Sequence, residues 1–269
     1  MLIATFNVNS IRQRLPHLTR WLQTRAPDIV CLQELKCLDE AFPREEIEAL
    51  GYQVETHGQK TFNGVAILSR HGIAIEHRGL PGFEDEQARY IEGVVSLPQG
   101  QGPATTKNPS VLRIAGVYFP NGNPLGSEKF AYKRNFMAAL TRHAKDLLAL
   151  EEPLVIAGDY NVIPQPEDAR FPENWRGDAL FQPESRADFR KLAALGFTDA
   201  IRATSDSDRL YSFWDYQAGA WQRDNGIRID HLLLSPQVVD RLVEAGIDRE
   251  LRAEEKPSDH VPVWCRLRL

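Results

Sequence analysis

The chain has 269 residues, of which 42% are hydrophobic, and this is enough for one large α/β domain or two small ones. Its net charge of −5 argues against a globally basic nucleic-acid-binding protein, although a local basic face remains compatible with it. The three cysteines, Cys31, Cys37 and Cys265, are too few and too scattered for a disulfide framework or a zinc site. No stretch reaches the roughly 20 apolar residues of a membrane helix, and the N-terminus lacks the pattern of a secretory signal. We therefore expect a cytoplasmic protein without membrane association.

Predicted strands alternate with helices along the first half of the chain. Short apolar runs predict the strands, which are Leu2–Phe6, Asp28–Leu32, Tyr52–Glu55, Gly64–Ser69, Tyr90–Leu97 and Val111–Phe119. A helix is predicted after Ser10, where an apolar stripe ends at Pro27, and another at 44–50. The polar stretch 98–110 is rich in Gln, Gly, Pro and Thr and is typical of a surface loop.

The second half continues this alternation. Ser127 is expected to cap a helix whose apolar face includes Phe136 and Leu140. The elements predicted after it are a strand at 154–157, a helix at 185–195, strands at 212–216 and 227–234, a helix at 236–245 and a last strand at 260–269. Residues 164–184 form a long irregular region, and loops of that length are usually functional. Many β segments with interspersed helices predict two packed sheets flanked by helices, in one domain spanning 1–269.

The most informative stretch is Val155–Asn161. A buried strand ends at Gly158 and is followed by Asp159 and Asn161, two residues apart. Side chains two apart in a strand point to the same side, so both should face one space at the rim of a sheet. The simpler interpretation is a polar turn after a strand.

Other predicted strands also end in polar groups. The five segments concerned present Asn7, Glu34, Asp159 with Asn161, Asp230, and Asp259 with His260. Carboxylates that converge on one rim repel one another, and a divalent cation would remove that cost. Oxygen ligands without a cysteine cluster favour Mg²⁺, or Mn²⁺, over Zn²⁺. A histidine beside these acids suits a phosphate ester, whose developing negative charge it can stabilise.

Each of these residues also has a structural interpretation. Glu34, taken alone, is most simply a solvated acid after a strand. Asp230 lies within an apolar run, and a buried acid needs a partner, for which His260 and Arg228 are the candidates. His231 is expected to point to the opposite face of the strand and to take no part in the site.

The chain resembles the exonuclease III family of abasic-site endonucleases, within the endonuclease/exonuclease/phosphatase superfamily. The resemblance runs nearly end to end, and the order and spacing of the matching pieces make it specific. In the N-terminal half these are Phe6-Asn7-Val8-Asn9, Leu32-Gln33-Glu34-Leu35-Lys36, His57-Gly58-Gln59-Lys60, Asn63-Gly64-Val65-Ala66 and Tyr118-Phe119-Pro120-Asn121. In the C-terminal half they are Gly158-Asp159-Tyr160-Asn161, Ser212-Phe213-Trp214-Asp215-Tyr216, Arg228-Ile229-Asp230 and Glu255-Lys256-Pro257-Ser258-Asp259-His260.

The resemblance implies an α/β fold, a four-layer α-β-β-α sandwich of two mixed β-sheets packed face to face and flanked by helices. It also implies a role for each residue of the rim. Glu34 would be the principal Mg²⁺ ligand, with Asn7 beside it and Asp259 in support. Asp159 would deprotonate the attacking water, which Asn161 would help to place. His260, held by Asp230, and the hydroxyl of Tyr118 would contact the scissile phosphate.

Substrate selection is expected to come from the loops. Lys36, Arg89, Asn121, Lys129 and Lys133 are candidates for contacts to DNA phosphates, which position a duplex without reading its sequence. For Lys129 and Lys133, a solvated helix face is the competing interpretation. Phe213, Trp214 and Ile229 are candidates for an apolar slot that holds a flipped, baseless sugar, although aromatic residues in a strand are more often part of the core. The 168–184 segment matches the family loosely and is expected to touch DNA.

The predicted function is that of a Mg²⁺-dependent DNA-repair phosphodiesterase, acting as a monomer on double-stranded DNA with abasic sites or 3′ ends. It would cut on the 5′ side of abasic sites and remove 3′-nucleotides and 3′-blocking groups. Two alternatives remain: a phosphohydrolase of the superfamily acting on phosphate esters other than DNA, and a non-catalytic DNA-binding protein of the same fold. The acidic pI mildly favours the first alternative, whereas the Phe213-Trp214 segment and the scattered Lys and Arg residues of the loops favour DNA.

Overall fold

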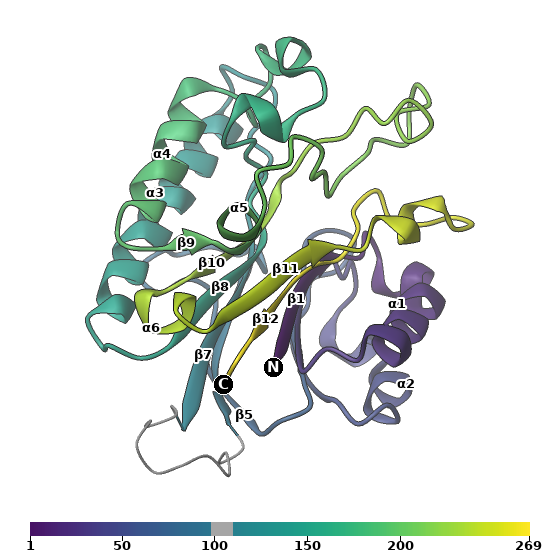
Figure 1. Cartoon of the computed structure of the whole chain (residues 1–269), viewed down its shortest axis with the longest axis vertical. Coiled ribbons are helices and arrows are strands. Elements are labelled where there is room, and N and C mark those ends of the chain that lie inside the picture. The colour runs from purple at the N-terminus through teal and green to yellow at the C-terminus, as the bar shows by residue number, and fades with distance from the viewer. Residues whose placement is uncertain (98–109) are drawn as a thin grey trace.

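Two six-stranded sheets pack face to face, and helices cover both outer faces, in a computed structural model that describes residues 1–97 and 110–269 (Figure 1). The predicted loop at 98–110 lies outside the described residues except for Ser110. Helices α1 (Ile11–Arg25) and α2 (Arg44–Glu48) cover one sheet, while α3 (Glu128–Leu148) and α4 (Pro183–Ala193) cover the other. The predicted four-layer α-β-β-α sandwich is confirmed.

The first sheet has the strand order β11-β12-β1-β2-β4-β3. Its members are β1 (Leu2–Asn7), β2 (Ile29–Gln33), β3 (Gln53–His57), β4 (Val65–Ser69), β11 (Leu242–Ile247) and β12 (Val263–Leu267). Strands β1 and β2 are parallel and are joined through α1, whereas the other neighbours are antiparallel.

The second sheet repeats this plan in the order β5-β6-β7-β8-β10-β9. Its members are β5 (Ile73–Arg78), β6 (Tyr90–Ser96), β7 (Val111–Tyr118), β8 (Leu154–Asp159), β9 (Thr198–Asp199) and β10 (Asp230–Leu234). Strands β7 and β8 form its parallel pair and are joined through α3. Each sheet therefore has a β-α-β unit at its centre, and the carboxyl ends of such strands are where open α/β sheets bind ligands.

Alternation along the strands builds three apolar layers. In β1, Ile3 faces the core between the sheets, while Ala4 and Phe6 face α1. The core between the sheets also contains Cys31 and Cys265, which are buried, free thiols packed there as small apolar residues. The third layer packs α3 and α4 against the second sheet. Among the described residues, no helix has the length and apolarity that a bilayer crossing requires.

The predicted helix at 236–245 is wrong beyond its first turn. Helix α6 covers Pro236–Val239 only, and the chain then forms β11 along β12. Gly246 lies in β11, where a Cβ would come within 2.6 Å of Cζ2 of Trp264, so the indole packs directly against the glycine backbone. Pairing with β12 and packing on this ring outweigh the helical pattern, since tertiary contacts override weak propensities.

Other predicted boundaries shift in smaller ways. Residues 212–216 form isolated bridges from Phe213 to Ile227 and His260 instead of a strand, and the strand predicted at 227–234 begins only at Asp230. Ser127 precedes α3 as predicted, but its hydroxyl bonds to the carbonyl of Pro124 and does not cap the helix. The remaining elements are α5 (Ala200–Thr204) and 3₁₀ turns at Asp39–Ala41, Pro166–Asp168, Pro172–Trp175 and Arg249–Ala253.

A buried carboxylate on the outer face of the second sheet is held by three donors. Glu92 accepts hydrogen bonds from Tyr90 Oη at 2.6 Å, from His143 Nε2 at 2.6 Å and from Arg113 Nη1 at 2.6 Å. Burial alone would raise the pKa of Glu92, but these partners outweigh it and lower the pKa to about 2 from its usual 4.5. The network ties β6 and β7 to α3.

Because of this network, the free energy of unfolding depends on pH. Because the pKa of Glu92 is depressed in the folded state, its contribution is complete above about pH 4.5 and is lost as the pH falls toward 2. Compared with Glu92→Gln in urea titrations, the wild-type protein should be more stable by about 3 kcal/mol at pH 7. This difference should shrink between pH 4.5 and the lowest pH at which both proteins still fold. A difference independent of pH over that range would contradict this account.

Candidate active site

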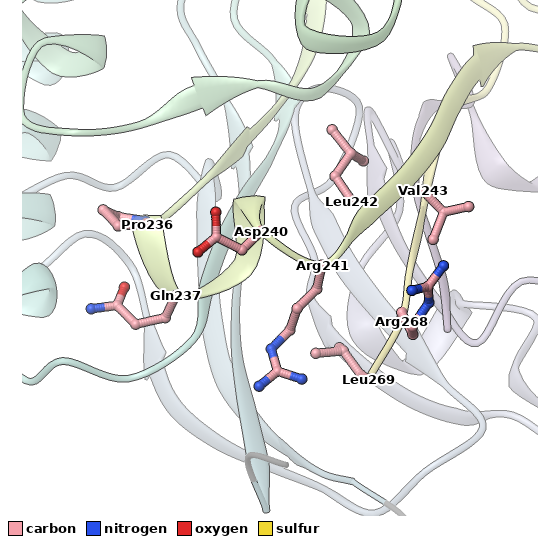
Figure 2. Close-up of a pocket in the computed structure, with 8 residues that line it drawn as sticks. All are labelled: Pro236, Gln237, Asp240, Arg241, Leu242, Val243, Arg268 and Leu269. Atoms are coloured by element: carbon pink, nitrogen blue, oxygen red, sulfur yellow. The ribbon is translucent and has the colours of Figure 1, made fainter. Parts of the chain in front are cut away.

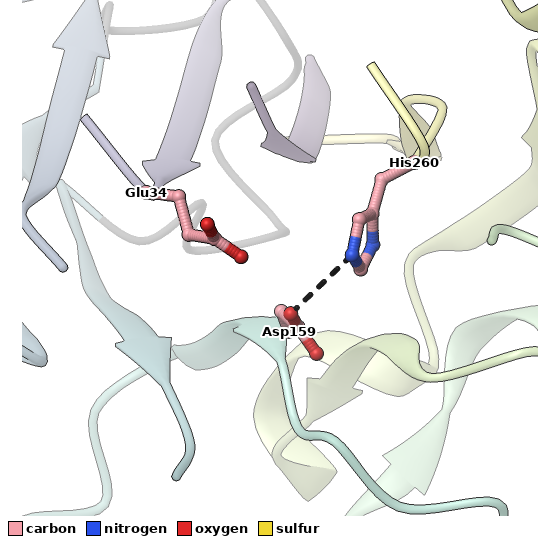
Figure 3. A group of neighbouring side chains, drawn as sticks. All are labelled: Glu34, Asp159 and His260. Carbon is pink, nitrogen blue, oxygen red and sulfur yellow. Dashed lines mark ion pairs between the residues drawn. The ribbon is translucent and has the colours of Figure 1, made fainter. Parts of the chain in front are cut away.

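Three side chains from distant parts of the chain meet where the central strands end (Figure 3). Glu34 follows β2, Asp159 ends β8, and His260 lies in the segment before β12. Each offers a ligand atom that lies within 4.8 Å of the others. Figure 3 shows Glu34 and His260 pointing toward Asp159 from opposite sides, and His260 Nε2 lies 3.6 Å from Asp159 Oδ2. The predicted convergence of strand ends is therefore present in the structure.

The carboxylate of Asp159 is fixed by its neighbours on both oxygens. The backbone N–H of Asn161 donates to Oδ1 at 2.9 Å, and Asn7 Nδ2 donates to Oδ2 at 3.0 Å. Asn161 has a positive φ of 48°, so the chain turns sharply after the strand and brings this N–H back toward Asp159. Burial raises the pKa of Asp159 to about 7, with His260 opposing this rise and Asp230 adding to it.

Glu34 accepts hydrogen bonds from three sides. Its Oε1 accepts from Asn7 Nδ2 at 2.9 Å and from Tyr118 Oη at 3.0 Å, and its Oε2 pairs with Lys36 Nζ at 2.9 Å. Burial favours the neutral acid, but Lys36 and Asn7 outweigh it, so the pKa of Glu34 is lowered. Burial, then Glu34 and Asp159, raise the pKa of the Tyr118 hydroxyl well above its usual value. Glu34 is thus an anion and Tyr118 a neutral hydrogen-bond donor.

His260 lies between two carboxylates. Asp159 and Asp230 are directly paired across β8 and β10, an arrangement in which like charges are destabilising. His260 Nδ1 lies 2.8 Å from Asp230 Oδ2, and its Nε2 is directed at Asp159. Burial alone would lower the pKa of His260, but Asp230 and Asp159 raise it to about 10. At neutral pH the imidazole is therefore a cation that relieves the repulsion between the two acids.

A cavity of about 360 Å³ opens above these groups. One part of its lining is polar, including the three side chains of Figure 3, and the other part is apolar. The complete lining is Glu34, Tyr118, Asn121, Asp159, Asn161, Trp175, Asp178, Leu180, Phe213, Asp215, Ile229, Asp259 and His260. A site with this division can hold a charged group against its polar wall and a sugar-sized group against its apolar wall.

The donor atoms fit a divalent cation that prefers oxygen. Glu34 and Asp159 supply carboxylates, and the raised pKa of Asp159 marks negative charge that a cation would stabilise. A second group with suitably placed ligand atoms is Glu76, His77 and Glu92. There, however, Arg113 already contacts both carboxylates and supplies the positive charge.

A larger hollow, of about 590 Å³, lies between α6, β11 and the C-terminal residues (Figure 2). Its lining consists of Pro236, Gln237, Asp240, Arg241, Leu242, Val243, Arg268 and Leu269. Among these described residues, Asp240 is the one acidic side chain and no imidazole is present. The hollow therefore lacks paired groups for acid–base or metal chemistry.

Comparison with known proteins places this geometry in a family. A sequence profile described as the Endonuclease/Exonuclease/phosphatase family matches residues 4–260. The chain belongs to the endonuclease/exonuclease/phosphatase family. The match spans every strand that contributes to the site, from β1 to the segment that carries His260.

Relatives within the endonuclease/exonuclease/phosphatase family are similar over their whole length. The chain is 34% identical to exodeoxyribonuclease III of Haemophilus influenzae, with 100% of both chains covered. A solved structure of a 3′ phosphatase, NExo, from Neisseria bound to a product DNA hairpin has a TM-score of 0.91 and 37% identity, with 100% of both chains covered. A structure of an AP endonuclease from Archaeoglobus fulgidus has a TM-score of 0.91 and 33% identity at the same coverage.

The structure brings the predicted catalytic and metal-binding residues to one place. Asn7 lies between Glu34 and Asp159, but its amide nitrogen faces them, and its oxygen accepts the backbone N–H of Asn9 at 3.0 Å. In this orientation Asn7 donates to both carboxylates, and its role as a metal ligand stays a prediction. Asp259 lines the cavity, and its carboxylate accepts a hydrogen bond from Asn9 Nδ2 at 2.9 Å.

Three of the predicted DNA contacts are contradicted by burial. Lys133 is 1% exposed and bonds to backbone carbonyls, and Trp214 is fully buried in a small aromatic cluster. Arg89 is 9% exposed, stacks on the ring of Tyr118 and donates to its carbonyl at 3.2 Å. Lys133 and Trp214 therefore present almost no surface to DNA in this structure, and Arg89 presents only a small part of its side chain.

The other predicted contacts keep surfaces that a substrate can reach. Asn121 and Phe213 line the cavity with accessible surface, Ile229 lines it but is only 2% exposed, and Lys129 is exposed on the first turn of α3. Lys36 is half-buried in its ion pair with Glu34. For all of these, contact with DNA stays a prediction.

Several residues that shape the site had no assigned role in the sequence. Ser212 donates a hydrogen bond to Asp230 at 2.6 Å, and Asn9 joins Asp259 to the ammonium of Lys36. Trp175, Leu180 and the other cavity residues of the irregular region lie within the segment that was predicted to touch DNA. Only an indirect signal for these residues was present in the sequence. Asn9 and Ser212 belong to motifs that match the family, and Trp175 and Leu180 lie in the 168–184 segment. Their contacts join residues far apart in the chain, so local patterns could not predict them. His231, as predicted, faces away and packs on Tyr160 and Phe189.

The pairing of His260 with Asp230 can be measured directly. In metal-free buffer, Asp230→Asn should lower the pKa of His260 from about 10 by about one unit or more, because an opposite charge in direct contact is lost. Nuclear magnetic resonance of labelled histidine follows this titration. Asp215→Asn, which removes an exposed acid from the same cavity, is the control and should leave the pKa close to the wild-type value. Equal shifts in the two variants would rule out a specific role for Asp230.

Proposed function

We propose that this protein is a Mg²⁺-dependent DNA-repair phosphodiesterase that acts on duplex DNA at abasic sites and at 3′ ends. One observation carries the proposal: a buried carboxylate with a raised pKa, Asp159, faces an imidazolium, His260, beside the anionic Glu34. A base, a cation and a metal-binding acid around one cavity are the parts that phosphodiester hydrolysis requires. The endonuclease/exonuclease/phosphatase relatives named as DNA nucleases support the choice of DNA as substrate.

We assign each residue a role that its position supports. Asp159, held by Asn161 and Asn7, accepts the proton of the attacking water. His260, held by Asp230, donates its Nε2–H to a phosphoryl oxygen, and the neutral hydroxyl of Tyr118 donates to the same phosphate. Glu34, with Asp259 near it, would hold the magnesium ion, which when bound neutralises charge on the phosphate and on the leaving 3′-oxygen.

The apolar wall of the cavity supports the proposed preference for abasic DNA. Trp175, Leu180, Phe213 and Ile229 form a surface that suits a sugar without a base. Extrusion of a nucleotide costs least where no base is stacked, so an abasic site enters such a cavity most readily. Incision on the 5′ side of the lesion would leave a 3′-hydroxyl, and the same centre would release 3′-nucleotides and 3′-blocking groups.

The first test is cleavage of a duplex that carries a synthetic abasic site and, on the same molecule, a recessed 3′ end. The wild-type protein should nick and trim it with Mg²⁺ and not with EDTA. Asp159→Asn should fold yet lose both activities by about 10³-fold or more, because the base is removed. Inositol phosphates tested side by side cover the competing phosphohydrolase function. Normal turnover by Asp159→Asn would contradict the assigned base, and activity on the inositol phosphates alone would contradict the DNA substrate.

The second test concerns the metal. Glu34→Ala should need at least about tenfold more Mg²⁺ for half-maximal cleavage, because the principal carboxylate ligand is lost. Glu76→Ala is the matched control, since it removes an exposed acid from the other group with suitably placed ligand atoms. Its Mg²⁺ requirement should equal that of the wild-type protein. An unchanged requirement in Glu34→Ala would remove Glu34 from the metal site.

A further inference from the structure

Lys133 is a buried lysine behind the proposed active site. It lies on α3, and its side chain is 1% exposed. The following turns of the same helix carry Phe136 and Leu140, which are packed in the apolar layer under the second sheet. Burial of a lysine is costly unless its polar end is fully bonded, so this position calls for a specific partner.

The amine of Lys133 joins two loops that both carry site residues. Its Nζ donates to the backbone carbonyl of Asn121 at 3.0 Å, in the loop after β7. It also donates to the backbone carbonyl of Asn161, in the loop after β8, in a shorter contact. Two donated bonds need two N–H groups, which the ammonium and the neutral amine both have, so the link does not depend on protonation.

The loop after β8 connects Lys133 to Asp159. Lys133 holds the carbonyl of Asn161, and the N–H of the same residue donates to Asp159 Oδ1 at 2.9 Å. The Asn161 side chain adds a bond to the carbonyl of Phe119 at 2.9 Å. Asn161 has a positive φ of 48°, a conformation that asparagine adopts more readily than most residues, and hydrogen bonds hold its N–H, its side chain and its carbonyl in this turn.

The chain also leaves room for this lysine. Gly122 has a φ of +90°, and a Cβ built there would lie 2.6 Å from Cδ of Lys133 and 3.3 Å from its Cβ. Any larger residue at 122 would therefore displace the lysine side chain. The path from α3 to the two carbonyls depends on a glycine at this point.

From these contacts we infer that Lys133 is a positioning residue for the hydrolytic reaction: it fixes the Asn161 peptide and, through it, the carboxylate of Asp159. The inference rests on the proposed role of Asp159 as the base. Without Lys133 the loop after β8 loses its anchor to α3, and the carboxylate samples orientations that do not reach the water. Displacement of a reacting group by about 1 Å is enough for a loss of about 100-fold.

The experiment compares Lys133→Met, which keeps the length and removes the donors, with Lys145→Met, which removes an exposed lysine from the same helix. Steady-state cleavage of the abasic duplex gives kcat and KM, and thermal unfolding gives the folded fraction. Lys133→Met should lower kcat per folded molecule by about 10- to 100-fold while KM stays within about twofold of wild type. Lys133→Gln, which keeps one donor group, should recover part of kcat, and Lys145→Met should match the wild-type protein.

A double variant separates positioning from general destabilisation. Added to Asp159→Asn, Lys133→Met should cause no further loss, because the group that it positions is already removed. If the two losses multiply, or if Lys133→Met has wild-type kcat per folded molecule, the inference is overturned. Should Lys133→Met not fold, Lys133→Gln and its double variant with Asp159→Asn carry the same comparison. A wild-type protein that does not cleave DNA at all would instead overturn the proposed function.

Discussion

The contact of one imidazole with two carboxylates is the interaction on which the site depends. Asp159 and Asp230 are cross-strand neighbours, and their repulsion in a buried setting would separate β8 from β10 at this end. His260 comes from the segment before β12, in the other sheet, and its charge stabilises both acids. The same contact therefore joins the two sheets and sets the protonation of the groups that we propose to do the chemistry.

The two β-α-β units explain why so many polar groups meet there. In each sheet the parallel pair lies near the centre, and each of these strands ends at, or just before, a side chain of the site: Asn7, Glu34, Tyr118 and Asp159. Packing the sheets face to face brings these ends together without any long excursion of the chain. The members of the endonuclease/exonuclease/phosphatase family that match this chain over its full length share this arrangement as a fold.

Local patterns in the sequence were sufficient to predict a helix or strand where apolar residues recur with a regular period. The strands that lead to Glu34 and Asp159 and the helix that carries Lys133 were predicted because apolar runs and stripes mark them. The strand β11 was missed because its residues suit a helix equally well and only β12 and Trp264 decide between the two. Convergence of the acids was predicted from strand ends, whereas the burial of Lys133 and Trp214 was not, since it depends on residues far away in sequence.

The first and last strands are neighbours, and this has a consequence for synthesis on the ribosome. Strand β1 pairs with β12, and the N and C ends lie close together in Figure 1. A nascent chain thus leaves one edge of β1 open until residues 260–267 have emerged, when His260 and β12 arrive together. The charge network around Asp159 and Asp230 therefore cannot form before residue 260 has been made, and a chain cut short before that point has neither a paired β1–β12 edge nor the imidazole between the two acids.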